Sequence, residues 1–442
     1  MDKPTIVKYV KAEKLHGRYQ LEQRFSDGVN IIHGKNGTGK TTLLHILANA
    51  LNGNYDRFVY LDFKSIDVHL NNDVKLKILQ KDKYTYVELN GEEIKKLDPE
   101  EVIELDNEKR KSRDDYRRHD IIETDVDDDL EGEPILPAAY FPAFRTMIEA
   151  WAAQNRTPRR FHARHYLNER KVLMTEFARR LFGPFVPNIV YSSILDIEVE
   201  LEKNIESAFI QVARKDRELL SQSFLNILPA LNPEVKNEES EELDPARLLV
   251  DIKDLLQELQ DAPFEYKPLA DINIYDQLRK TVKNFPTTVT QEGVGARILN
   301  LYKELLVDRI SEQNEVFKEI EKYLNSVNEF LDEKNISVSE SFNRRNDAAI
   351  VVSFSDGSES NLRTLSSGER QILTLLYAAT RMSKQEVVLI DEPEISLHVD
   401  WQRRLISRMS DQLSNRQIIT CTHSPVIGAD YEKAKQELRI IN

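Results

Sequence analysis

The chain has 442 residues, with 61 Lys and Arg against 75 Asp and Glu, and a formal net charge of −14. Hydrophobic residues make up 40% and charged residues 31%, which excludes a disordered, collagen-like or fibrous protein. The single cysteine, Cys421, excludes an internal disulfide framework and a multi-cysteine zinc site. Because the sequence contains neither an apolar run of about 18 residues nor an apolar signal-peptide core, we expect a cytoplasmic protein without a membrane partner.

The N-terminal region alternates between strand and helix patterns. Strands are expected at 5–11, 19–25 and 29–33, and a helix at 42–51, where apolar residues recur at helical spacing. The next expected elements are two strands at 58–62 and 74–78, a hairpin at 84–94 with a tight primed turn at Asn90-Gly91, and an exposed or mobile charged loop at 106–133.

The pattern between about 146 and 332 is helical, with apolar stripes at 248–259 and 299–331 and an acidic break at 232–244. Two interpretations are open: a helical subdomain packed on a core, or a helical hairpin that protrudes or pairs between subunits. The remaining expected elements are a strand at 349–354, a helix at 371–382, and apolar strands at 387–390 and 417–422.

The strongest motif is a glycine-rich loop between the strand at 29–33 and the helix at 42–51. It matches the Gly-x4-Gly-Lys-Thr phosphate loop and is followed by Thr42; its residues are Gly34, Lys35, Asn36, Gly37, Thr38, Gly39, Lys40 and Thr41. Its glycines let backbone N–H groups turn toward phosphates, and the following helix presents its positive end to them. Lys40 is predicted to reach the β- and γ-phosphates of ATP, and the Thr41 hydroxyl to bind Mg2+.

A second motif follows the apolar strand at 387–390. Asp391 stands at the carboxyl end of that strand, where open α/β sheets bind ligands, and is predicted to hold the Mg2+ shell. Glu392 follows directly and is the candidate general base that polarises the attacking water. The alternative is a buried strand that ends in an acidic turn.

Two further motifs flank this pair. Ser367 and Gly368 open a predicted helix, where a hydroxyl, free N–H groups and the helix dipole form an anion site, or an ordinary N-cap. His423 follows the last apolar strand and is placed to contact a γ-phosphate or the attacking water; the alternative is a capped strand end. Cys421 is interpreted as a buried strand residue.

Together these motifs resemble those of the ATP-binding-cassette ATPases over residues 1–145 and 335–442. The resemblance implies a head-to-tail ATP sandwich, and therefore a homodimer or higher homo-oligomer with ATP and Mg2+. It places the following residues of one copy opposite Ser367 and Gly368 of another: Lys40, Thr41, Asp391, Glu392 and His423. Ser396 and His398 fall where the family has its D-loop.

The 326 positions between Lys40 and Ser366 exceed those of a transport cassette. This split, with the Asp-Glu-Pro-Glu-x-x-Leu-His and Thr-His-Ser-Pro runs, resembles the RecF/SMC/OLD group, and most of all the ATPase subunits of the PARIS (AriA-like) and Septu or retron (PtuA-like) anti-phage modules. The implied fold is α/β: a split ABC-type P-loop head, with a mixed sheet, flanking helices and an antiparallel β subdomain. Its halves are 1–145 and 336–442, and 146–335 is a helical insertion.

The segment from Tyr140 to Arg145 resembles the Q-loop region of that group. Arg145 is the candidate Q-loop equivalent, which would contact nucleotide or take the coupling role; the alternative is a surface arginine after a strand-end proline turn. Residues 156–180 hold eight Lys and Arg against two Glu. They form either a surface for DNA, RNA or an acidic protein, or a solvated helix face that pairs with the acidic loops at 123–133 and 238–244.

The resemblance implies a Mg2+-dependent ATPase that acts as the sensor or scaffold subunit of an anti-phage system and controls a separately encoded nuclease or toxin. The alternative is a RecF/SMC-like DNA repair or recombination ATPase that binds DNA directly. Asp127-Asp128-Asp129 fits an Asp-x-Asp nuclease pattern but lacks a supporting strand, so we expect no metal-nuclease chemistry there.

Overall fold

The computed structural model describes residues 4–119, 133–148, 163–230, 244–261, 280, 294–339, 350–413 and 416–441. The chain divides into two compact units, one formed by residues 1–197 and 365–442 and the other by residues 198–364. This division differs from the expected boundaries after 145 and 335. Phe141 stacks on Tyr191 with ring centroids 4.5 Å apart, and the Asn49 amide donates to the Phe185 carbonyl at 2.9 Å, so residues up to 197 pack with the N-terminal half.

The first unit contains a five-stranded sheet whose strand pairs are all parallel, in the order β14-β3-β13-β12-β8. The strands are β3 (Val29–His33), β8 (Ala138–Phe141), β12 (Val387–Asp391), β13 (Gln417–Thr422) and β14 (Lys435–Glu437). Both faces of β12 and β13 are buried, which is why their sequences are nearly continuous apolar runs. Because parallel strands share one carboxyl edge, the segments after His33, Asp391 and Thr422 meet there.

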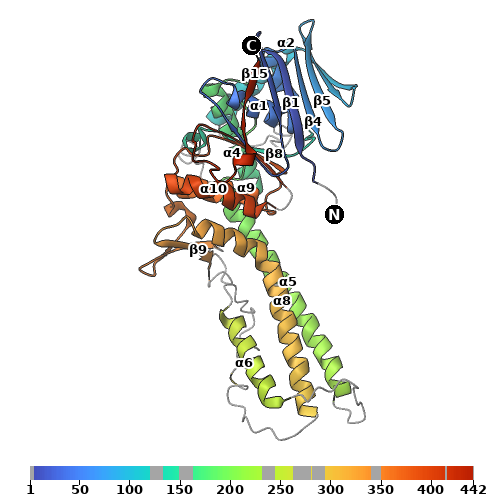
Figure 1. Cartoon of the computed structure of the whole chain (residues 1–442), viewed down its shortest axis with the longest axis vertical. Helices are drawn as coiled ribbons and strands as arrows, with labels where there is room; N and C mark the ends of the chain where they lie inside the picture. Colours follow the sequence, from blue (N-terminus) through green and yellow to red (C-terminus); the bar gives the residue numbers. More distant parts are fainter. Residues whose placement is uncertain are drawn as a thin grey trace. The chain divides into compact units, whose positions relative to one another are not determined.

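A seven-stranded antiparallel sheet, in the order β15-β2-β1-β4-β5-β6-β7, forms the second layer (Figure 1). Its strands are β1 (Val7–Leu15), β2 (Tyr19–Arg24), β4 (Ser65–Leu70), β5 (Lys75–Lys81), β6 (Tyr84–Leu89), β7 (Glu92–Leu97) and β15 (Arg439–Ile441). Helix α1 (Lys40–Leu51) packs between the layers, since one apolar core joins its side chains to both sheets. The expected α/β class is confirmed, and the expected mixed sheet is two separate sheets.

Two local expectations were wrong. Residues 58–62 do not form a strand, because Tyr55–Tyr60 is a 3-10 helix (η1). Residues 106–119 are not a loop but belong to helix α2 (Pro99–His119), where Asp106 is anchored by Arg57. Glu, Lys and Arg are good helix formers, so this charged segment can form a helix, and Val102 of the same helix packs against the apolar core. Residues 120–132 lie outside the described residues. The hairpin turn is confirmed, with positive φ at Asn90 (54°) and Gly91 (89°).

Three more helices belong to the first unit: α4 (Ala163–Phe182), α9 (Ser367–Ala379) and α10 (Val399–Gln412). Helix α9 begins four residues before the expected start at 371 because Ser366 caps it in a reciprocal capping box. The Glu369 N–H donates to the Ser366 hydroxyl at 3.3 Å, and the Glu369 carboxylate accepts the Ser366 N–H at 2.6 Å. The 3-10 turn η4 (Glu432–Ala434) precedes β14.

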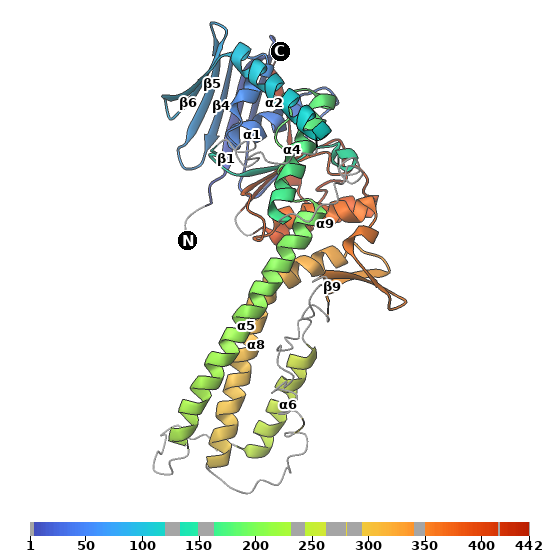
Figure 2. The same ribbon diagram turned by 180° about the vertical axis from the view of Figure 1, so that it is seen from behind.

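The second unit is mainly helical, with α5 (Ile194–Ala230), which starts in the first unit, α6 (Pro245–Asp261), α8 (Val294–Asn328) and the 3-10 turn η3 (Leu362–Thr364). Helices α5 and α8 run antiparallel and side by side (Figure 2), with Phe209 against Phe317 and Asp216 paired with Arg309. A three-stranded sheet joins β9 (Lys334–Val338), β10 (Ile350–Phe354) and β11 (Glu359–Ser360). Within the described residues, no helix is long and apolar enough to cross a lipid bilayer. Most of the acidic break, residues 231–243, lies outside them.

Candidate functional site

The glycine-rich loop leads from β3 into α1, and its geometry depends on its glycines. Gly37 and Gly39 have φ values of 77° and 79°, in the left-handed region that favours glycine. Lys40, the first residue of α1, is 5% exposed, and its Nζ donates to the carbonyls of Gly34 at 2.8 Å and Lys35 at 3.0 Å. Removal from water lowers the pKa of Lys40. The loop therefore encloses a cation at the start of a helix.

Thr41 and Asp391, 350 positions apart in the sequence, are in direct contact. The Thr41 hydroxyl donates to Asp391 Oδ2 at 2.8 Å. The pKa of Asp391 is raised to about 6, chiefly by burial and also by the neighbouring Glu392 carboxylate, although the Thr41 hydrogen bond lowers it. A hydroxyl beside a buried carboxylate is the oxygen donor set that Mg2+ prefers, so these residues fit a magnesium site.

His423 lies between Glu392 and Lys40. Its Nδ1 is 3.4 Å from Lys40 Nζ, and its Nε2 is 3.4 Å from Glu392 Oε1. Because an ammonium can only donate, Nδ1 is the acceptor in the contact with Lys40, and Nε2 is the ring nitrogen that faces the Glu392 carboxylate. Glu392 itself has a left-handed φ of 46°, and its N–H donates to the Cys421 carbonyl at 2.8 Å. The strained turn holds the Glu392 carboxylate beside His423.

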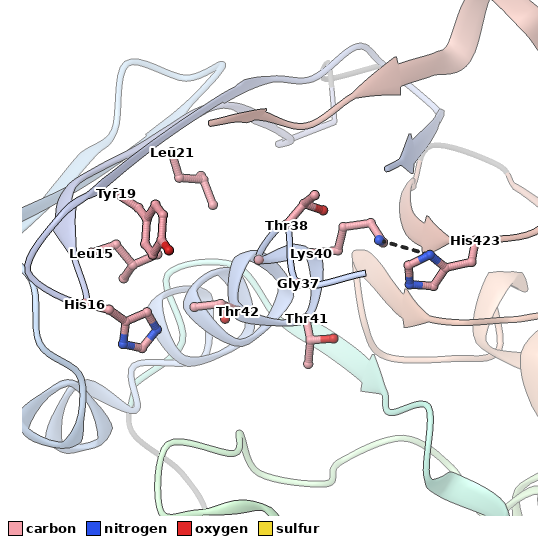
Figure 3. Close-up of a pocket in the computed structure, with 11 residues that line it drawn as sticks. Leu15, His16, Tyr19, Leu21, Gly37, Thr38, Lys40, Thr41, Thr42 and His423 are labelled. Atoms are coloured by element: carbon pink, nitrogen blue, oxygen red, sulfur yellow. Dashed lines mark hydrogen bonds between the residues drawn. The ribbon is translucent and has the colours of Figure 1, made fainter. Parts of the chain in front are cut away.

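A cavity of about 280 Å³ opens over the glycine loop (Figure 3). His423 and Lys40 stand at one end of it, and His16, Tyr19, Leu15 and Leu21 from the β1–β2 hairpin stand at the other. Sequence reasoning did not find these four residues, because only the packing of the two sheets brings the hairpin to the loop. The guanidinium of Arg18 lies 5.2 Å from the Tyr19 ring centroid. The cavity thus joins a polar end to an aromatic and apolar end.

The signature residues occupy the start of α9. Ser367 is exposed, whereas Gly368 is buried against the segment after β12. A Cβ on Gly368 would lie 2.8 Å from the Ser396 carbonyl oxygen and 3.3 Å from the Trp401 ring. Gly368 is therefore needed for packing within this chain, and neither signature residue lines the cavity above the glycine loop.

The two D-loop candidates are both exposed. Ser396 has a positive φ of 66°, so the backbone bends sharply there. The side chain of His398 is 69% exposed, and its Nδ1 accepts the Asp400 N–H at 3.4 Å as the N-cap of α10. These residues present a bent, polar segment to the outside of the first unit.

Arg145 is buried behind the strand that carries Asp391. Its guanidinium donates to the carbonyl oxygens of Pro142 (2.9 Å), Asp391 (3.0 Å), Glu392 (3.3 Å) and Pro393 (3.4 Å). The residue is 1% exposed, so it is not the surface arginine of the alternative interpretation. The geometry gives Arg145 a role in fixing the backbone of the acidic turn.

Glu394 is a residue that sequence reasoning passed over. One of its carboxylate oxygens, Oε1, accepts the Thr422 hydroxyl at 2.8 Å, the His423 N–H at 2.8 Å and the Ser424 N–H at 3.0 Å. The second glutamate of the Asp-Glu-Pro-Glu run was the available signal. Glu394 ties the turn after β12 to the turn after β13, and so fixes the backbone that carries His423.

The basic segment at 156–180 is described only in part. Residues 156–162 and the side chains of 163–169 lie outside the described residues, as do most of the acidic loops at 123–133 and 238–244. Lys171 pairs with Asp196 at 3.7 Å, and Arg179 donates to the Val186 carbonyl and to Asn188. At least these two basic side chains bind other parts of the protein.

A phosphate loop, a strand-end Asp-Glu pair and a histidine on the neighbouring strand end, built on a parallel sheet, define an ATPase of the ATP-binding-cassette type. Residues 29–430 match the family model described as "AAA domain, putative AbiEii toxin, Type IV TA system", and the chain belongs to this family.

Curated relatives match over shorter stretches. The chain is 28% identical over 99 residues to the "Retron Vc95 probable ATPase" of Vibrio cholerae serotype O1 biovar El Tor, covering 20% of this chain and 19% of that protein. It is 35% identical over 75 residues to the "Retron Ec83 probable ATPase" of Escherichia coli, covering 14% of each. The matches thus span at most about a fifth of these relatives. With the family match, they confirm the expected class, an ABC-type ATPase related to retron ATPases.

Solved structures align over nearly the whole chain at low similarity. An Smc head domain with an extended coiled coil from Pyrococcus furiosus has a TM-score of 0.40 and 13% identity, and covers 99% of this chain and 96% of that one. The recombination mediator protein RecF has a TM-score of 0.35 and 11% identity, and covers 100% of this chain and 99% of that one.

Proposed function

We propose that this chain binds and hydrolyses ATP with Mg2+, and that two copies close head to tail on the nucleotide. The observation that carries the proposal is the meeting of Lys40, Thr41, Asp391, Glu392 and His423 at one sheet edge, from segments more than 300 residues apart. Bound Mg2+ would neutralise charge on the phosphates and orient them, with Thr41 and Asp391 as its protein ligands.

The side chains of the site have distinct tasks in this reaction. Lys40 already lies over the glycine loop and neutralises the terminal phosphates of ATP. Glu392 takes the proton of the attacking water, and His423, whose Nε2 lies 3.4 Å from Glu392 Oε1, positions the Glu392 carboxylate for this step. Tyr19 and His16, at the far end of the cavity, face the base and ribose.

The head-to-tail dimer is proposed because the signature residues, Ser367 and Gly368, do not line the cavity above the glycine loop of their own chain. Ser367 is exposed at the positive end of α9, where it can donate to the phosphates held by another copy. Each chain carries one phosphate loop and one signature, so a complete site needs two chains, and a homodimer closes two such sites.

The test is nucleotide binding and turnover by the whole chain. Lys40→Ala should lose ATP affinity, because the loop loses its enclosed cation. Glu392→Gln should keep ATP affinity, lose at least about 100-fold in turnover, and accumulate an ATP-bound dimer in light scattering. Turnover of Glu392→Gln equal to that of the unchanged chain would refute the assignment of the base. Chelation of Mg2+ should abolish turnover and be reversed by added Mg2+.

For the biological role, we propose a cytoplasmic sensor or scaffold subunit of an anti-phage system that controls a separately encoded nuclease or toxin. The support is the family and the retron ATPases that resemble the chain. The experiment is co-expression with the protein encoded beside it, followed by purification and phage challenge. The proposal expects a co-purifying effector whose release depends on Glu392. DNA binding that weakens with salt, without any co-purifying effector, would instead favour the repair function.

A further inference from the structure

A second cavity, of about 80 Å³, lies in the first unit beside the C-terminal end of α1. Several elements line this cavity. Its lining includes Asn54, which precedes η1, Arg57 of η1, Asp106 and Arg110 of α2, and Arg179 of α4. None of its lining residues belongs to the cavity above the glycine loop. Because α1 has 12 residues, the two sites lie near opposite ends of a helix about 18 Å long.

Three guanidinium groups line this cavity, and among the residues that the structure describes only Arg57 has a carboxylate within 4 Å. Arg57 forms a bidentate pair with Asp106, at 2.7 and 2.8 Å, and Tyr60 also donates to Asp106 at 2.7 Å. Within the described part of the chain, Arg110 and Arg179 have no carboxylate oxygen within 4 Å, although Asp56 and Glu176 also line the cavity. Two guanidinium groups of the cavity therefore have no carboxylate in direct contact among the described residues.

The amide groups of the cavity leave one buried donor unused. A guanidinium can only donate, and Arg179 Nη2 lies 2.7 Å from Asn188 Oδ1. This contact identifies the oxygen of the Asn188 amide, so the other end of the amide is its NH2 group. This NH2 group donates to Asn54 Oδ1 at 3.1 Å, which fixes the orientation of the Asn54 amide as well. Asn54 is 8% exposed, and its Nδ2 has no hydrogen-bond partner among the residues described. Buried donors are normally hydrogen-bonded, so Asn54 Nδ2 fits an acceptor atom of a bound ligand.

The pKa of Arg179 also favours a negatively charged ligand in this cavity. Removal of its guanidinium from water, and then the nearby charge of Arg57, lower the pKa of Arg179 to about 9. The group stays charged near neutral pH, and the direction of the shift shows that burial and the neighbouring arginines outweigh the effect of the Asp106 and Asp56 carboxylates, which raise this pKa. Asp106 acts on Arg179 through its charge, but its hydrogen bonds are with Arg57 and Tyr60.

We propose that this cavity binds the phosphate group of a small molecule, with Arg110, Arg179 and Asn54 Nδ2 as the donors to its oxygens. Planar guanidinium groups match the geometry of phosphate oxygens, and hydrogen bonds between two charged groups are about twice as strong as neutral ones. The group is either free inorganic phosphate or the phosphate of a nucleoside monophosphate. The site is independent of the proposed ATPase function, because it shares no residue with the nucleotide cavity.

The test is calorimetric titration of inorganic phosphate and of AMP into the whole chain carrying Lys40→Ala, at constant ionic strength. This background weakens competing binding at the glycine loop. We expect saturable binding that Arg110→Met and Asn54→Asp, each added to the background, weaken at least about tenfold. Arg24→Met, which removes an exposed arginine elsewhere in the first unit, is the matched control and should leave the affinity unchanged.

The two ligands separate the sources of the phosphate group: AMP binding more tightly than phosphate indicates a nucleotide, and equal affinities indicate the free ion. The proposal is overturned if neither ligand binds saturably, or if both variants keep the affinity of the Lys40→Ala background. Thermal unfolding accompanies each titration. If Asn54→Asp proves unstable, Arg110→Met decides, because the half-buried Arg110 side chain forms no ion pair with any described residue.

Discussion

Glu394 Oε1 accepts the backbone N–H of His423 at 2.8 Å, and the same oxygen takes the Thr422 hydroxyl and the Ser424 N–H. The turn that carries Glu392 is thereby fastened to the turn that carries His423 by one carboxylate oxygen. A small shift between these turns would change the 3.4 Å separation of Glu392 and His423. Glu394 is thus placed to position the two side chains without touching the nucleotide itself.

Glu394→Ala should lower kcat by about tenfold or more while ATP affinity changes little, because hydrogen bonds that position His423 are lost and the enclosure of Lys40 remains. Glu394→Gln should restore most of the rate, since its amide oxygen can accept the same donors. Steady-state hydrolysis and ATP titration measure both. Equal rates for the alanine variant and the unchanged chain would contradict the positioning role.

Gly368→Ala should destabilise the chain even without nucleotide. The new methyl would meet the Ser396 carbonyl oxygen at 2.8 Å, and such overpacking costs about 1–3 kcal/mol. Ser367→Ala is the matched control. Because Ser367 is exposed, this substitution should leave the free energy of unfolding unaltered. Both variants should lose turnover. If thermal unfolding of the Gly368→Ala chain matched that of Ser367→Ala, the close approach to Ser396 would be of no energetic consequence.

Arg145→Met should lower the unfolding free energy by about 3 kcal/mol, since carbonyl oxygens of the acidic turn would lose their buried charged donor. Arg145→Lys should be intermediate, because one ammonium cannot span the carbonyls that the planar guanidinium reaches. Chemical denaturation without nucleotide makes the measurement. A methionine variant that unfolded like the unchanged chain but bound ATP more weakly would favour nucleotide contact instead.

His45 should make the fold sensitive to acid. Burial lowers the pKa of His45 to about 3, and its Nε2 lies 2.9 Å from the Tyr140 hydroxyl. In the unfolded chain the same group titrates near 6.5. Between these values the unfolded state binds one more proton, so stability falls as the pH drops, by up to about 1.4 kcal/mol per pH unit. Denaturation of His45→Gln between pH 4 and 6 should show a slope smaller by this amount; an unchanged slope would contradict the assignment.

Some elements depend only on residues that are close together in the sequence, and these could be predicted from it. The glycine loop, the apolar strands before Asp391 and His423, and the Asn90-Gly91 turn follow from glycine torsions, continuous burial and primed-turn preferences, which neighbouring residues suffice to set. The charged helix α2 differs from the expected loop because its docking includes the pair between Asp106 and Arg57, 49 positions earlier in the sequence. No neighbour of Asp106 in the sequence indicates that partner.

The sequence by itself named the side chains that would carry ATP chemistry, since each follows a strand or opens a helix in a recognisable order. Tertiary structure decided what surrounds them: Tyr19 and His16 across the cavity, Arg145 behind the acidic turn and Glu394 beneath His423. Those contacts depend on two sheets packing around α1 and on parallel strands from both ends of the chain sharing an edge. Long-range packing of this kind has no signature in the spacing of residues along the chain.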